Sequence, residues 1–149
     1  IRPIWLYRGT VDVPADRVAS IVTMGNPAIW WTGTLAVPAV AVIGVLKRDR
    51  SAAWILAALL STWLPWALAA RRLTFIYHFL PATPFLALGL VYCFARLAER
   101  FPRARSAGIA LVAIAALLFV LFFPLLTGMS VPRTYAEALQ WLKTWIFFA

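Results

Sequence analysis

The chain has 149 residues, of which 64% are hydrophobic and only 13% are charged. This composition excludes an ordinary soluble domain and indicates a protein that crosses a membrane several times. The net charge of +9 does not point to nucleic acid, because the basic residues lie in short connections between apolar runs, where they fit membrane topology and anionic head groups.

The first predicted element is a short surface helix within residues 13–22, where apolar residues recur at helical spacing. Four apolar runs follow, each close to the roughly 20 residues that cross a hydrocarbon core. They predict spans over residues 27–46, 52–70, 73–95 and 108–126. Five prolines fall inside these spans and are expected to kink their helices: Pro38, Pro65, Pro81, Pro84 and Pro124.

The last predicted element is an interfacial helix over residues 134–148. Its apolar positions share one helical face, and they are Ala138, Leu139, Leu142, Trp145 and Ile146. The predicted fold is therefore an all-α membrane protein, with four transmembrane helices and flanking amphipathic helices in the interface. The 149 residues are mostly used by the spans, which leaves no room for a separate soluble domain, and because the first residue is Ile1 rather than Met, the chain is read as a piece of something longer or a processed product.

The charge count alone does not orient the spans. One face collects Lys47, Arg48, Arg50, Arg96, Arg100, Arg103 and Arg105, and the other collects Arg2, Arg8, Arg17, Arg71, Arg72, Arg133 and Lys143. The first set lies in tight loops, where the positive-inside rule holds best. We therefore expect those loops in the cytoplasm and both chain ends outside.

This topology predicts a cluster of functional side chains at the outer face. Arg71 and Arg72 separate the second and third spans, and Tyr77 and His78 follow in the first turns of the third. Asn26 stands at the start of the first span. Arginine suits phosphate because its planar fork donates two parallel hydrogen bonds, and a helix start adds N–H groups and a positive dipole end.

Each of these residues also has a structural interpretation. Arg71 and Arg72 are equally suited to flank a short turn, His78 to bond a neighbouring helix, and Asn26 to cap its helix. The tryptophans at this face fit an aromatic belt as well as a binding platform. Asp12 and Asp16 are four residues apart and are read as solvated or capping acids rather than as a catalytic carboxylate pair, and Asp49 and Glu99 are read as local charge balance in the basic loops.

Several other chemistries find no support in the sequence. One histidine and one cysteine do not make an ordinary zinc site, so neither a metal nor a cofactor is expected. No glycine-rich phosphate loop and no nucleophile with a nearby base is present. No span carries an acidic residue, which weakens a proton-coupled transporter.

The motifs at this face resemble the C-terminal four-helix region of protein O-mannosyltransferases. They are GNPAIWW (residues 25–31) and STWLPWALAARRLTFIYHFLPATPF (residues 61–85), flanked by RPIWLY (residues 2–7) and QWLKTW (residues 140–145). The resemblance covers nearly the whole chain. Where many members of that family have two histidines before the aromatic residue, this chain has Tyr77, His78 and Phe79.

The resemblance implies a membrane glycosyltransferase of the GT-C type, which moves mannose from a polyprenyl- or dolichyl-phosphate carrier to serine or threonine of an acceptor protein. The reaction is expected on the extracytoplasmic side of the plasma membrane or the endoplasmic reticulum. The family's catalytic Asp-Glu pair lies in an early outer loop and has no counterpart in this chain. The resemblance thus implies that this segment binds the lipid-phosphate donor, through Arg71, Arg72, Tyr77, His78 and Asn26, beside the N-terminal part of the same enzyme.

Two other functions remain open from the sequence. One is a membrane scaffold or assembly subunit, in which the aromatic residues and prolines only pack helices. The other is a related lipid-dependent glycosyltransferase with a different sugar or acceptor, because no sugar-reading residue is identifiable.

Overall fold

The computed structural model describes residues 4–8, 13–68 and 76–147. They form two compact units. The helical unit comprises residues 27–115, and the flanking unit comprises residues 1–26 and 116–149. The boundary between the units falls within helix α4 (Arg103–Thr127).

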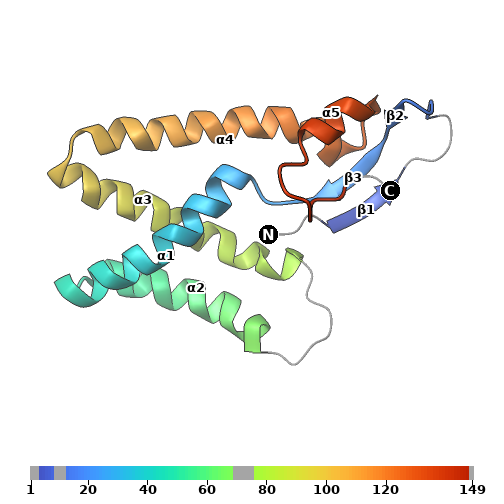
Figure 1. Cartoon of the computed structure of the whole chain (residues 1–149). Coiled ribbons are helices and arrows are strands. Elements are labelled where there is room, and N and C mark those ends of the chain that lie inside the picture. The colour runs from blue at the N-terminus through green and yellow to red at the C-terminus, as the bar shows by residue number, and fades with distance from the viewer. Residues whose placement is uncertain (1–3, 9–12, 69–75, 148–149) are drawn as a thin grey trace. The chain divides into compact units, whose positions relative to one another are not determined.

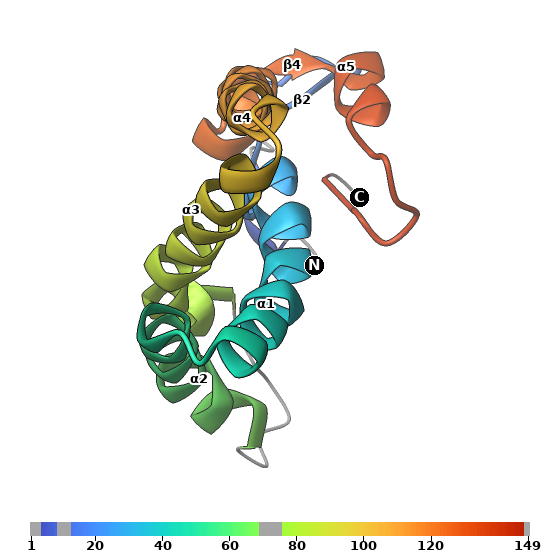
Figure 2. The ribbon, with the colours of Figure 1, turned by 90° about the vertical axis from the view of Figure 1, so that its left-hand side faces the viewer.

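The helical unit contains three helices that each contact the other two (Figure 1, Figure 2). They are α1 (Pro27–Lys47), α2 (Arg50–Leu68) and α3 (Thr83–Arg100), and the 3₁₀ helix η1 (Ile76–Ala82) precedes α3. With α4, four helices are long and apolar enough to cross a membrane. The predicted all-helical membrane fold is confirmed in these four helices.

The third predicted span differs most from the structure. A continuous helix over residues 73–95 was expected, whereas the structure has η1 followed by α3, and α3 continues to Arg100. Prolines explain the change, because Pro81 and Pro84 have no N–H for an α-helical bond to the residue four positions before. Pro84 stands at the start of α3, where a missing N–H costs little.

The turn between α3 and α4 is also determined by a proline. Phe101 has extended backbone angles of φ −132° and ψ 100°. Pro102 follows it, and a residue before proline is driven out of the helical region by the pyrrolidine ring. α3 therefore ends at Arg100 and α4 begins at Arg103, five residues before the predicted start.

α1 and α3 pack closely at Gly33. A Cβ at this position would lie 2.6 Å from Cγ of Leu86, a distance that no side chain tolerates. Leu86 belongs to a small buried cluster with Leu59 and Ala82. Glycine at position 33 therefore lets α1 approach Leu86 of α3, which packs with Leu59 of α2 and Ala82 of η1.

The flanking unit contains two short antiparallel sheets. β1 (Ile4–Arg8) pairs with β3 (Ser20–Thr23), and β2 (Arg17–Val18) pairs with β4 (Val131–Pro132). The surface helix predicted within residues 13–22 is wrong, since this segment forms β2 and β3. Its alternating burial, with Ser20 and Val22 inside, has the period of two that a strand requires.

The predicted interfacial helix is also largely absent. α5 covers only Arg133–Ala138, and no helix continues through residues 139–147. Leu139 and Trp145 are buried, but Leu142 and Ile146 of the same predicted face are exposed. Residues 139–147 instead contribute Leu139, Trp145 and Phe147 to the hydrophobic core of the flanking unit.

Trp145 and Phe147 pack edge-to-face against Phe122 of α4 in the core of the flanking unit. Aromatic side chains bury large areas. The alternation of buried and exposed residues in this tail shows that one long helical face is not what covers the core.

Candidate functional site

The helical unit has two ends of different chemistry. We call the end that contains the α1–α2 turn and the last turns of α3 the clamp end. The opposite end contains the start of α1, the last turn of α2 and η1, and we call it the aromatic end. α2 has 19 residues and is about 28 Å long at 1.5 Å per residue, so the two ends correspond to the two faces of a bilayer.

η1 lies between α1 and α2 at the aromatic end. The ring of His78 lies 4.2 Å from the ring of Trp66 in α2, at an interplanar angle of 46°. The next residue, Phe79, has its ring 5.0 Å from that of Trp30 in α1. Two consecutive residues of η1 thus contact both neighbouring helices through aromatic rings, His78 against α2 and Phe79 against α1.

Two of the predicted site residues lie outside the described part of the chain, namely Arg71 and Arg72. The backbone of Tyr77 lies in η1. Asn26 directly precedes Pro27, the first residue of α1, and belongs to the flanking unit. The described geometry of this site therefore rests on Trp66 and His78.

A half-buried histidine against a tryptophan ring is oriented by that contact. Imidazole carries a donor or acceptor at each ring nitrogen, and the aromatic contact restricts the direction in which these nitrogens point. Arg72 lies six residues from Trp66 and six from His78 along the chain. Arg71 and Arg72 thus belong to the stretch of sequence that joins Trp66 to His78.

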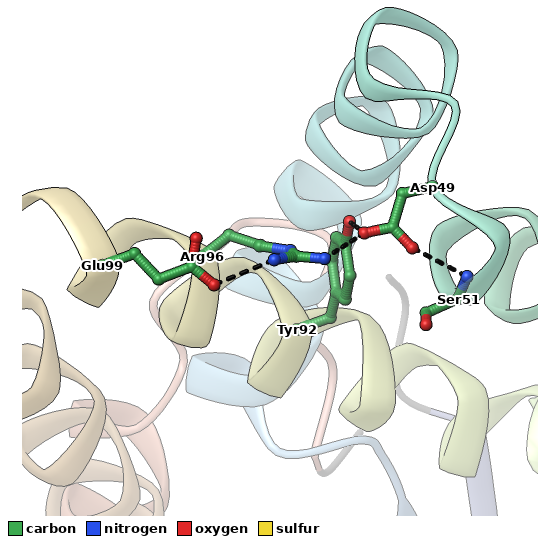
Figure 3. A network of polar contacts seen from close by, with 5 residues as sticks. All are labelled: Asp49, Ser51, Tyr92, Arg96 and Glu99. Atoms are coloured by element: carbon green, nitrogen blue, oxygen red, sulfur yellow. Dashed lines mark hydrogen bonds and ion pairs between the residues drawn. The ribbon is translucent and has the colours of Figure 1, made fainter.

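The clamp end is built around Asp49 (Figure 3). One oxygen of this carboxylate, Oδ1, accepts a hydrogen bond of 2.8 Å from the backbone N–H of Ser51, which makes Asp49 the N-cap of α2. The other, Oδ2, accepts a 2.7 Å hydrogen bond from the hydroxyl of Tyr92 and forms an ion pair with Arg96. Glu99 binds the same guanidinium at 2.9 Å.

Asp49 also closes α1. Its N–H donates to the carbonyl of Gly44 at 3.1 Å, while Arg48 has a positive φ of 49°. This is the left-handed turn that ends many helices. Because Asp49 both ends α1 and caps α2, the turn between the two helices consists of only Arg48 and Asp49.

The polar contacts at Asp49 lower its pKa. The hydrogen bond from Tyr92, followed by those from Arg96 and from the Ser51 amide, lowers the pKa of Asp49 from 3.8 to about 2. The carboxylate is therefore charged at every physiological pH. Its side chain is only 11% exposed, and all three partners come from the helical unit, so the group acts as a structural clamp between α1, α2 and α3.

The sequence indicated only local charge balance at Asp49 and Glu99. The structure instead gives Asp49 two specific partners on a different helix, 43 and 47 residues away. A signal was present, because Tyr92 and Arg96 are four residues apart and share a face of α3. An acidic residue directly before an apolar run is also a typical N-cap.

Comparison with known proteins gives the family. Residues 5–145 match the model of the C-terminal four-transmembrane region of protein-O-mannosyltransferase. The polyprenol-phosphate-mannose–protein mannosyltransferase of Corynebacterium glutamicum is 28% identical over 160 residues, and that of Mycobacterium tuberculosis strain H37Rv is 28% identical over 159. The protein of the same name in Mycolicibacterium smegmatis strain MKD8 is 25% identical over 162 residues.

Each of these alignments covers 97% of this chain but only 30% of the relative. No solved structure matches the chain. The family match extends over both units and includes the segments that carry Trp30, Trp66 and His78. The chain therefore belongs to the family of C-terminal four-transmembrane regions of protein O-mannosyltransferases.

Proposed function

We propose that this chain is the C-terminal membrane part of a protein O-mannosyltransferase and that its aromatic end binds the phosphate of a polyprenyl-phosphate-mannose donor. The curated relatives are named for that donor and for a protein acceptor. The partners in this proposal are the lipid donor, the acceptor protein and the remaining part of the same enzyme, since the chain spans about three-tenths of the relatives' length.

The observation that carries the proposal is the contact of His78 with Trp66, with Arg71 and Arg72 in the segment that joins them. Arginine presents several donors in a planar fork, and imidazole adds a directed N–H. In the transfer reaction the acceptor hydroxyl attacks the anomeric carbon and the lipid phosphate leaves. Cationic donors stabilise the negative charge that develops on this phosphate.

We assign no catalytic carboxylate to this chain. The acid or base that activates the acceptor hydroxyl belongs, in this proposal, to the remaining part of the enzyme. Tyr77 and Asn26 are assigned to donor binding with the arginines and His78, on the basis of the family resemblance. The donor needs no metal or cofactor in this scheme.

We place the aromatic end on the extracytoplasmic side of the plasma membrane, or on the lumenal side of the endoplasmic reticulum. The clamp end holds both tight basic loops, residues 47–50 and 96–105, which contain seven basic and two acidic residues. Short basic loops are retained in the cytoplasm during insertion. The aromatic end then faces the opposite compartment.

The test uses the full-length enzyme reconstituted with polyprenyl-phosphate-mannose. Arg72→Ala and His78→Ala are each expected to weaken donor binding about tenfold or more, because each removes a hydrogen bond to a charged group. Arg103→Ala at the clamp end is the matched control for Arg72→Ala. Trp54→Ala removes an exposed tryptophan of α2 and is the matched control for the aromatic variant Trp66→Ala.

The readouts are donor affinity and the rate of mannose transfer to an acceptor peptide, measured on protein of verified fold. Unchanged donor affinity in both Arg72→Ala and His78→Ala overturns the proposal. A scaffold role predicts a different pattern, in which these substitutions lower only the amount of folded protein.

A further inference from the structure

A groove of about 860 Å³ lies in the helical unit, and its lining includes Ile29, the residue before Trp30 at the start of α1. Its walls are mainly α3 and the first half of α4, which diverge from the turn at Phe101 and Pro102 (Figure 1), and α1 contributes Ile29. The volume falls in the range of small-molecule sites, about 300–1,000 Å³. The lining is almost entirely apolar, and Glu99 and Arg105 are its two charged residues.

The two charged residues share one end of the groove. Glu99 lies in the last turn of α3 and Arg105 in the first turn of α4, so both belong to the clamp end. Glu99 is already bound to Arg96. Arg105 is exposed and makes no ion pair with any residue in the described ranges. The mouth of the groove therefore carries an available positive charge.

The depth of the groove matches one leaflet of a bilayer. The lining extends from Arg105 to Ala115 along α4, ten residues or about 15 Å, and from Ala87 to Glu99 along α3, twelve residues or about 18 Å. A hydrocarbon core is about 30 Å thick. A transmembrane helix laid against this surface would need a groove across the full thickness, whereas a lipid chain needs only half.

The walls of the groove leave room for a flexible chain. Small residues from both helices contribute to the lining, including Ala95 and Ala98 of α3 and Gly108 of α4. A Cβ on Gly108 would touch the ring of Phe94 at 3.5 Å, so the two helices approach each other near the mouth. Beyond it, the apolar walls offer van der Waals contact without a hydrogen-bonding group.

We propose that this groove binds an anionic glycerophospholipid, with its phosphate at Arg105 and an acyl chain between α3 and α4. Charge complementarity supports this occupant, because the loops at the clamp end contain seven basic and two acidic residues. The phosphate site at Arg105 lies at the opposite end of α3 from the proposed donor site, and the apolar lining runs from there to Ala87 of α3 and Ile29 of α1. The groove holds a resident lipid rather than the sugar carrier.

The first test measures the lipids that the full-length protein retains. The protein is reconstituted in nanodiscs of equimolar phosphatidylglycerol and phosphatidylcholine with identical acyl chains, extracted in mild detergent, and analysed by mass spectrometry. Retained phosphatidylglycerol should exceed phosphatidylcholine about fivefold, the effect of one arginine near an anionic lipid. Arg105→Gln should abolish this enrichment, whereas Arg103→Gln, which does not line the groove, should preserve it.

A second test locates the lipid in the wild-type protein, so that it does not depend on a variant that folds. Phosphatidylglycerol with a photoreactive group near the end of one acyl chain should label residues 87–95 or 108–115. Ala98→Phe should reduce this labelling by obstructing the groove, whereas Ala107→Phe, on α4 outside the lining, should leave it unchanged.

Three results overturn the proposal. They are equal retention of the two phospholipids, the same effect of Arg105→Gln and Arg103→Gln, and labelling confined to other parts of the protein. Preferential retention of polyprenyl phosphate would assign the groove to the donor instead. Its occupation by a helix from the remaining part of the enzyme would appear as absence of lipid labelling there.

Discussion

The two ends of the helical unit use charge in opposite ways. At the clamp end Asp49, Tyr92 and Arg96 bind one another and form a compact group. At the aromatic end the helices meet through rings, and the charged residues belong to the connecting segment. A high density of arginines therefore does not by itself identify a binding site, because the more basic end is the one whose central ion pair has a structural role.

The largest loss of stability is expected from Asp49→Ala. This change removes the N-cap of α2, the hydrogen bond from Tyr92 and the ion pair with Arg96 together. It leaves a guanidinium that is 33% exposed without its main partner. We expect the melting temperature in detergent to fall by several degrees, with donor affinity of the folded fraction unchanged. Loss of donor binding without loss of stability would contradict the separation of the two ends.

The second prediction concerns acid. The pKa of Asp49 is lowered from 3.8 to about 2, so the carboxylate's contribution to stability is complete above the unfolded-state value and is lost as pH falls from about 4 to about 2. Asp49→Asn retains a side chain that can cap the helix but does not titrate. Melting temperatures measured between pH 2 and 7 should converge for the two proteins at the acid end, and parallel curves would refute the assignment.

A smaller effect is expected at the edge of the clamp. Glu99 is 57% exposed and binds Arg96 from three residues away on the same helix. Exposed pairs of this kind contribute little, so Glu99→Gln should cost less than about 0.5 kcal/mol in the free energy of unfolding. Denaturant titration measures this value. A loss as large as that of Asp49→Ala would show that the clamp is centred on Arg96 rather than on Asp49.

The smallest effect on stability is expected at the aromatic end. His78→Phe keeps a flat ring against Trp66, which lies 4.2 Å from the native imidazole, but removes both ring nitrogens. The melting temperature should stay the same while donor affinity falls as in His78→Ala. An unchanged affinity would mean that the ring, rather than its N–H, is what the donor requires.

The four membrane helices could be predicted from sequence because their signal is local and long. Apolar runs of this length have few other structures available in a membrane. The bounds of the third helix could not be predicted as well. Pro81 and Pro84 were recognised as sources of kinks, but the 3₁₀ form of η1 and the packing of its Phe79 against Trp30 and of its His78 against Trp66 were not.

The flanking elements were harder still. Residues 13–22 are compatible with both a helix and strands, and the pairing of β2 with β4 joins Val18 to Val131, which are far apart in the chain. Short segments of this kind take their structure from such partners. The candidate site stays a prediction from motifs and topology, because Arg71 and Arg72 lie outside the described residues, whereas the partners of Asp49 required the structure.

Because Asp49 both ends α1 and caps α2, it limits the insertions that the turn between these helices can accept. Arg48 and Asp49 are the two residues between α1 and α2, and both are committed to ending one helix and starting the next. One added residue would separate the two functions and rotate Asp49 away from Tyr92. Insertions, tags and linkers at this hairpin are therefore expected to be poorly tolerated, although exposed turns usually accept them.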